Sequence, residues 1–273
     1  MPDVTQPKWL QRWRHSLPLW AASAPALLFL ALPLLALVLH ISPATLLSHV
    51  TNPQVAQAIS LSISTTLVST ALALVFGTPL AYLIARRSFP GRVAFDTLVD
   101  LVIVLPPAVA GIALLVTFGR RGFIGQSLHA VGIDIAFTSL AVVLAQTFVA
   151  GPFYVRTAIT ALGTVSHEIE EAAEIDGASA WQVFWHITLP LTLPSLLAGA
   201  IMTWARALGE FGATIIFAGS FPGTTRTIPL LIYLGFELDL QTALVLAGIL
   251  LALAFGVLLT VRLILRRQLA SWF

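Results

Sequence analysis

The sequence contains no cysteine, and its only lysine is Lys8. Without cysteine the chain has no disulfide bond, no thiolate metal site and no cysteine nucleophile. A phosphate-binding loop of the form GxxxxGK, followed by serine or threonine, needs a lysine to reach the nucleotide phosphates. Because Lys8 lies outside any such motif, we expect this chain not to hydrolyse ATP itself.

Charged residues are also scarce, at 10% of the chain, whereas soluble domains carry roughly 25%. Hydrophobic residues make up 58%, and the mean hydropathy is +0.94. These values place the chain among membrane proteins, with lipid as its surroundings. The net charge of +2 is too small to indicate a nucleic-acid partner.

Six apolar segments are long enough to cross roughly 30 Å of hydrocarbon, which takes about 20 helical residues. They cover residues 18–40, 57–85, 96–118, 136–158, 190–217 and 242–265. The first is too long for the apolar region of a cleaved signal peptide, so we expect it to be retained. The fold class predicted from this pattern is an all-α, polytopic membrane protein with about six transmembrane helices.

The distribution of basic residues predicts the orientation of these spans. With six spans the termini share one side, and that side carries Lys8, Arg12, Arg14, Arg86, Arg87, Arg92, Arg262, Arg266 and Arg267. The opposite side carries Arg120, Arg121 and Arg226. Nine basic residues against three predict that both termini are cytoplasmic. The expected organisation is a cytoplasmic segment 1–17, one transmembrane domain 18–267 with a cytoplasmic loop 159–189, and a short cytoplasmic tail 268–273.

The loop between the fourth and fifth spans concentrates acidic charge. Five of the twelve acidic residues lie in it, namely Glu168, Glu170, Glu171, Glu174 and Asp176. A bilayer does not accommodate that density of charge, so we expect this loop in water. Apolar residues at helical spacing predict a short helix over 167–179, with Ser166 as N-cap and Gly177 at its end. Large apolar side chains from Trp181 to Ile187 follow, and would seat the loop on the bundle or in the groove of a partner. The pattern alone fits a solvated loop helix or a docking helix.

The order and spacing of this loop resemble the EAA motif of the permease subunits of bacterial ABC importers. The matching residues are Glu171, Ala172, Ala173, Asp176, Gly177 and Ala178, then Phe184, Ile187, Leu189 and Pro190. The resemblance implies the type I permease fold in the bacterial inner membrane, with the loop helix acting as a coupling helix in a cleft of an ATP-binding subunit.

The same resemblance implies a set of partners. They are a second permease copy forming a homodimer, two ATP-binding subunits, and a periplasmic or lipid-anchored oxyanion-binding protein. ATP and magnesium would be bound by the ATP-binding subunits, and no cofactor by this chain.

Further segments resemble the molybdate permease family. They are VLPPAVAG (104–111), FGRRGFIGQSL (118–128), ITLPLTLPSL (187–196), ARALGEFGATIIFAG (205–219) and TRTIP (225–229). Sulfate and thiosulfate permeases are similar in the LGEFGA stretch, in TNPQV (51–55) and in SFPGR (88–92). We therefore expect a molybdate importer, with sulfate, thiosulfate or tungstate as the alternative anion.

Two features inside the spans are candidates for the translocation path. Arg206 and Glu210 are one helical turn apart in the expected fifth span, with Gly209 beside the glutamate, and can form an ion pair. The pair either locks helix packing or lines and gates the path of a dianion. Pro106 and Pro107 interrupt the expected third span, because proline lacks the amide donor of the helical ladder. Such a break lines a cavity or is a packing kink.

The remaining charged residues suggest no enzyme. Asp96 and Asp100 are expected at a solvated helix start, and Arg120 with Arg121 faces headgroups or an acidic patch on a delivery protein. His167 and Glu168 begin like the zinc motif HExxH, but position 171 is glutamate. We expect no catalytic residue and no metal ligand, which disfavours an intramembrane enzyme. An ion-driven secondary carrier would not need the coupling helix.

Overall fold

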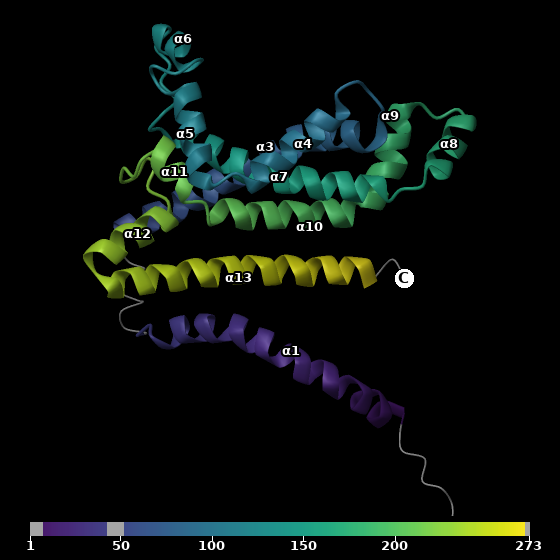
Figure 1. Ribbon diagram of the computed structural model, residues 1–273, viewed down its shortest axis with the longest axis horizontal. Helices are drawn as coiled ribbons and strands as arrows, with labels where there is room; N and C mark the ends of the chain where they lie inside the picture. Colours follow the sequence, from purple (N-terminus) through teal and green to yellow (C-terminus); the bar gives the residue numbers. More distant parts are fainter. Residues whose placement is uncertain (1–7, 43–51, 271–273) are drawn as a thin grey trace, which may run out of the picture.

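The computed structural model describes residues 8–42 and 52–270, and every regular element in these ranges is helical (Figure 1). Residues 1–7 of the expected N-terminal segment, Thr51, and residues 271–273 of the expected tail lie outside the described residues. The longer helices are α1 (Lys8–Leu39), α3 (Pro53–Arg86), α4 (Arg92–Val104), α5 (Pro107–Phe118), α7 (Ser139–Gly163), α10 (Leu189–Leu208), α12 (Ile228–Leu238) and α13 (Leu240–Ala270). The shorter ones are α6 (Gly125–Ala130), α8 (His167–Ile175), α9 (Ala180–Val183), the π-helix η1 (Phe184–Thr188) and α11 (Gly212–Phe217).

The predicted number of spans agrees with the structure. In the described ranges, the segments long and apolar enough to cross a bilayer as continuous helices are Leu19–Leu39, Pro53–Arg86, Ser139–Gly163, Ala180–Leu208 and Leu240–Val261. A sixth span exists if α4 and α5 are counted together, although these two helices are bent by 116°. The all-α class is confirmed, but the third span is a broken helix, since its axis turns where Pro106 and Pro107 interrupt the ladder.

The fifth span also differs from the prediction. We expected one helix over residues 190–217, whereas α10 ends at Leu208 and the separate helix α11 begins at Gly212. The hydrogen-bond ladder of α10 stops at Gly209, and the chain changes direction before α11. Glycine and the following polar residue weaken the ladder here, where an apolar run alone would have continued it.

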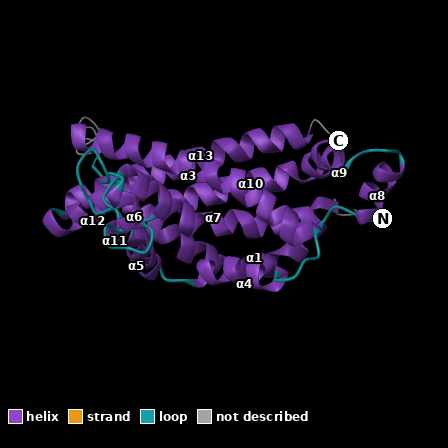
Figure 2. Ribbon diagram, turned by 90° about the horizontal axis from the view of Figure 1, so that it is seen from above, coloured by secondary structure: helices purple, strands orange, loops and turns teal. Residues whose placement is uncertain are grey.

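The long helices lie roughly side by side along the longest axis of the molecule (Figures 1 and 2). One end of the bundle, which we call the α8 end, carries α8, α9 and the last residues of α13 (Figure 1). The other end, the α12 end, carries α5, α6, α11 and α12 (Figure 1). The acidic loop therefore lies at the same end as the described C-terminal residues of the chain, as the six-span topology requires.

Helices α3, α7 and α10 form the centre of the bundle. Close approach of α3 and α7 depends on Gly77, because a Cβ atom there would lie 3.0 Å from the side chains of Tyr154 and Val155. The Tyr154 hydroxyl, inside this interface, lies 2.6 Å from the hydroxyl of Thr78. Gly199 of α10 is similarly tight against Thr157 of α7. Small residues at these crossings let the helices pack closely in the absence of a hydrophobic driving force between spans.

Candidate functional site

The helix of the acidic loop has defined ends. Ser166 caps α8 by accepting a hydrogen bond from the Glu168 amide at 3.2 Å. At the other end Gly177 has a φ of +96°, which favours glycine. The Gly177 amide donates to the carbonyl of Glu174, and the Ala178 amide donates to that of Ala173, which is the Schellman pattern. The predicted helix-capping roles of Ser166 and Gly177 are confirmed.

The predicted extent of this helix was too long. Instead of reaching residue 179, α8 ends at Ile175, and the chain turns at Gly177 before α9 begins. Ser179 and Gln182 form a reciprocal capping box at the start of α9. That box starts a new helix, and η1 then leads directly into α10. The acidic loop therefore contains two short helices separated by a turn.

The residues of the EAA motif lie on the surface of this segment. Glu171, Ala172, Asp176 and Gly177 are exposed, and Ala173 and Ala178 are half-buried. No residue of α8 is buried, and Ile175 is 85% exposed. A large apolar side chain on an otherwise polar, small-residue surface is typical of a surface that another protein covers.

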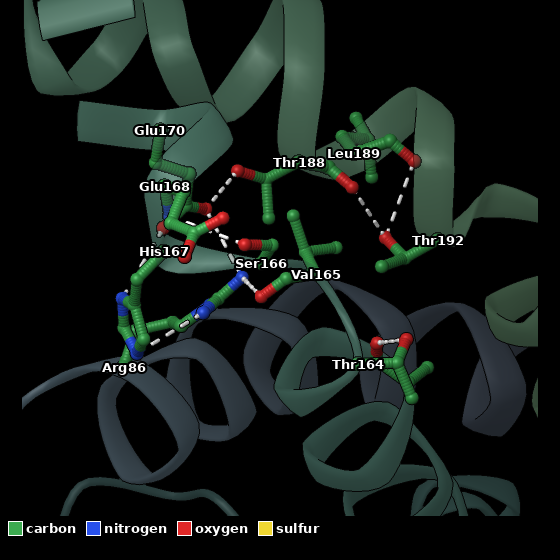
Figure 3. Close-up of polar contacts among 11 residues, drawn as sticks. Arg86, Thr164, Val165, Ser166, His167, Glu168, Glu170, Thr188, Leu189 and Thr192 are labelled. Atoms are coloured by element: carbon green, nitrogen blue, oxygen red, sulfur yellow. Dashed lines mark hydrogen bonds and ion pairs between the residues drawn. The ribbon is translucent and has the colours of Figure 1, made fainter. Parts of the chain in front are cut away.

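An ion pair with little exposed side-chain surface attaches α8 to the bundle (Figure 3). Glu170 lies 3.2 Å from the guanidinium of Arg86 at the end of α3, and the two side chains are 13% and 3% exposed. The Thr188 hydroxyl donates to the same carboxylate at 2.5 Å. Arg86 also donates to the Val165 carbonyl at 2.8 Å, just before α8. We call Arg86, Glu170 and Thr188 the clasp, because they join the end of α3, α8 and the start of α10.

Sequence analysis did not identify the clasp. Arg86 was counted as one of the basic residues that orient the spans, and Glu170 as one of five acidic residues in a solvated loop. Their pairing joins residues 84 positions apart, so no local spacing reveals it. The available signal was that Glu170 lies one helical turn after Ser166, the predicted N-cap.

Arg206 and Glu210 form the expected ion pair, at 2.8 Å, but not within one continuous helix. Arg206 is in the last turn of α10, whereas Glu210 lies in the break after it. The other carboxylate oxygen of Glu210 accepts a hydrogen bond from the Ala213 amide at 2.8 Å, in the first turn of α11. Glu210 is 1% exposed, and the Arg206 side chain is 31% exposed and lies over the Phe153 ring. The glutamate is thus fully paired, while part of the guanidinium is accessible.

The structure brings the two predicted path features together. A Cβ atom on Gly111 of α5 would lie 2.9 Å from the backbone of Ala213. A Cβ atom on Gly212 would lie 2.9 Å from the Pro107 side chain. The break at Pro106 and Pro107 therefore packs directly against the break at Gly209 and Glu210. In a bilayer, irregular backbone survives only where protein or a water-filled cavity surrounds it. Each break covers part of the other, while Pro106 and Gly209 stay exposed on this chain.

Asp96 and Asp100 are partly solvated, as expected, with side chains 42% and 57% exposed, but they are also ion-paired, which the expectation did not include. Arg156 of α7 lies 2.9 Å from Asp96 and 2.5 Å from Asp100. It also donates to the backbone carbonyl of Asp96 at 3.3 Å. One turn of α4 places both carboxylates on the face that meets α7, so an arginine near the end of that span finds two partners.

At the α12 end, two basic residues contact the Asp134 carboxylate. Arg120 lies 3.0 Å from it and His129 lies 2.9 Å from it. Desolvation acts to raise the pKa of Asp134, but the hydrogen bonds and charges of Arg120 and His129 outweigh it and hold that pKa below its usual value. Arg120 is thus engaged within the chain, which leaves Arg121 as the residue of the expected pair with no ion-pair partner in the described part of the chain. The described residues hold no cluster of histidine, aspartate and glutamate suited to a metal ion.

Comparisons with known proteins agree with this geometry. The model of the family described as "Binding-protein-dependent transport system inner membrane component" matches residues 77–269. The molybdenum transport system permease protein ModB of Mycobacterium bovis is 42% identical over 249 residues, which cover 90% of this chain and 94% of that protein. The sulfate transport system permease protein CysT of Escherichia coli is 37% identical over 238 residues, which cover 86% of each chain.

A solved structure shares the fold at low identity. It is a bacterial alginate ABC transporter in complex with an alginate pentasaccharide-bound periplasmic protein, with a TM-score of 0.72 and 20% identity over 94% of this chain and 96% of that chain. The predicted fold, that of type I ABC importer permeases, is confirmed.

The clasp generates a prediction about the stability of the acidic loop. Replacing Glu170 with alanine leaves the buried Arg86 guanidinium without a carboxylate, which costs about 3 kcal/mol. We expect a lower unfolding temperature of the detergent-purified protein and faster protease cleavage within residues 159–189. The matched control is Glu174→Ala, which removes an exposed carboxylate from the same helix. Equal behaviour of the two variants would contradict a structural role for the clasp.

Proposed function

The chain belongs to the family of binding-protein-dependent transport system inner membrane components, and we propose that it is the permease subunit of an ATP-driven molybdate importer. The observation that carries the proposal is the 42% identity to a molybdenum permease, over 90% of this chain. The permease would form the translocation pathway and carry out no covalent chemistry. ATP hydrolysis would take place on a separate subunit.

The choice of anion rests on the difference between two relatives. Identity to the sulfate permease is 37% at similar coverage, which is below the 42% to the molybdenum permease. Molybdate, tungstate and sulfate are all tetrahedral dianions, so a separate binding protein would supply most of the selectivity. Sulfate or thiosulfate import remains the second candidate because of that similarity.

The surface of α8 supports docking to an ATP-binding subunit. Together with the turn after it, α8 presents Glu171, Ala172, Asp176 and Gly177 as exposed residues, and Ala173 and Ala178 as half-buried ones. Small side chains there would let a partner approach closely, and the exposed Ile175 would enter its cleft. The clasp would then transmit movement of α8 to α3 and α10, because Arg86 ends α3 and Thr188 precedes α10.

Two copies of the permease would assemble around the pathway, with two ATP-binding subunits and one periplasmic or lipid-anchored oxyanion-binding protein. The apolar α1 supports a second copy, because none of its residues in Leu19–Leu39 is buried within this chain. The basic-residue bias supports placing the α8 end, with both termini, in the cytoplasm of a bacterial cell.

Arg206, Gly209, Glu210, Pro106 and Pro107 would line or gate the pathway. The partly exposed guanidinium of Arg206 would attract a dianion, while Glu210 would reduce the strength of that attraction. A weak site suits conduction, because a strong one would retain the anion. Packing of the two helix breaks against each other would let this region switch between two arrangements as the helices move.

Competitive uptake tests the proposal. The permease, its ATP-binding subunit and its binding protein would be reconstituted in liposomes with ATP inside, and uptake of labelled molybdate measured. Excess tungstate should compete strongly and excess sulfate weakly. Dominant competition by sulfate would favour the second candidate, and uptake without the ATP-binding subunit would contradict the ATP-driven mechanism.

Two substitutions at Gly177 distinguish a role in docking from a role in helix capping. Asparagine tolerates a positive φ, whereas valine adds a backbone cost of about 1–2 kcal/mol there. Among the described residues, other than the two chain neighbours, none lies within 4 Å of a Cβ at Gly177, so either side chain would start in open space on the side proposed for the partner. We expect both Gly177→Asn and Gly177→Val to insert normally and to uncouple ATP hydrolysis from uptake. Normal coupling in the asparagine variant would show that Gly177 serves capping alone.

The substitution Glu210→Gln tests whether the Arg206–Glu210 pair acts in the translocation path or only in helix packing. Glutamine keeps the shape and can still accept from the Ala213 amide, but the charge-assisted bond to Arg206, worth about 1.5–3 kcal/mol, is lost. We expect uptake to fall about tenfold with dimer assembly intact. Glu237→Gln, at an exposed position of α12, is the control. Loss of the dimer in the Glu210 variant would assign the pair to packing instead.

A further inference from the structure

A groove lies between α3 and the segment formed by α9 and η1, next to the clasp but separate from it. Its volume is about 630 Å³. The lining residues are Leu74, Val75, Thr78, Pro79, Tyr82, Leu83, Arg87, Ala180, Trp181, Phe184, Trp185 and Leu189. Most of these side chains are apolar, and the only charged one is Arg87.

Aromatic side chains form one wall of the groove. Phe184 packs edge-on against Tyr82 with ring centroids 5.2 Å apart, and Trp181 packs against Trp185 at 5.5 Å. Trp181 is 69% exposed although it lies beside a strongly charged loop. Tryptophan and tyrosine are enriched where a bilayer meets water, because their rings have an apolar body and a polar atom. The wall therefore marks the boundary of the bilayer at the α8 end.

The length of the groove matches one leaflet. It runs along α3 from Leu74 to Arg87. These residues are 87 − 74 = 13 positions apart, so the groove is about 20 Å long at 1.5 Å per residue. Half of a bilayer, with its headgroups, is roughly 20–22 Å thick. A lipid lying along α3 would reach Arg87 with its headgroup and Leu74 with its acyl chain.

Charge identifies the headgroup. Arg87 is exposed and has no ion-pair partner among the described residues, whereas its neighbour Arg86 is ion-paired with Glu170 in the clasp. Basic pockets between spans at the cytoplasmic boundary attract anionic headgroups. We propose that this groove binds one anionic phospholipid of the surrounding bilayer, with its phosphate on Arg87 and an acyl chain against Val75, Leu83 and the aromatic wall. The proposal rests on the proposed orientation, with the α8 end at the cytoplasmic side of the bilayer, and does not depend on the transported anion.

Lipid titration by native mass spectrometry tests the proposal. The delipidated permease, purified with its ATP-binding subunit, would be titrated with phosphatidylglycerol and with phosphatidylcholine of the same acyl chains. We expect about fivefold tighter binding of phosphatidylglycerol, lost in Arg87→Gln and kept in Arg92→Gln, an exposed arginine at the same end that does not line the groove. Ala180→Phe, which narrows the groove, should weaken binding of both lipids. An unchanged preference in Arg87→Gln, or equal loss in Arg92→Gln, would overturn the proposal.

Photo-crosslinking decides between a lipid and a protein in the groove. A photoreactive amino acid at Leu83, 41% exposed and lining the groove, would be activated in native membranes. An adduct with the mass of an anionic phospholipid supports the proposal. An adduct with a second permease copy or with the ATP-binding subunit would overturn it, because the groove would then be a protein interface.

Discussion

Hydrocarbon offers no hydrogen-bond partner, so each interruption of a helix and each charge within the spans must be satisfied by the chain itself. That constraint explains the centre of the α12 end. The Glu210 carboxylate accepts from Arg206 at one side and from the Ala213 amide at the other, which covers the gap between α10 and α11. The second break, at Pro106 and Pro107, is protected because α5 packs on α11 with glycine at both contacts. Two irregular segments that would each be unfavourable in lipid thus lie against each other, with Glu210 buried between the ends of α10 and α11.

The same need to pair charges within the chain determines the structure of the α8 end. Arg86 could have remained in the headgroup region, but its side chain is 3% exposed because Glu170 and the Val165 carbonyl receive it. This fixes α8 to two long helices while Glu171, Ala172 and Ile175 of α8 remain exposed. Rigid attachment on one side and a small-residue surface on the other are the two properties that a lever driven by a partner needs. If the clasp were absent, movement of α8 would be absorbed by the loops around it.

At the α8 end, the adjacent residues Arg86 and Arg87 lie in two different environments. Arg86 points into the clasp, whereas Arg87 lies at the groove whose aromatic wall comes from α9 and η1. Water and a protein partner would meet α8, and the bilayer would meet α9 and η1. The capping box at Ser179 separates these two short helices, so a change in one need not distort the other. A lipid in the groove would therefore be well placed to influence the lever from the membrane side.

Composition and order alone determined the all-α membrane class, about six spans and the exposed loop, because apolar length and charge density are local properties of the sequence. They also located the caps at Ser166 and Gly177, which depend on residues within one turn. Local patterns failed where partners are distant. The spacing of Arg206 and Glu210 suggested one helix, yet a helix break separates them, and Asp96 and Asp100 were paired by an arginine 60 and 56 positions away. Only tertiary packing decided that the break at Pro106 and Pro107 contacts the start of α11, and that Arg86 pairs with Glu170. Each of these contacts joins segments far apart in the sequence, and no local pattern specifies which distant segments will pack together.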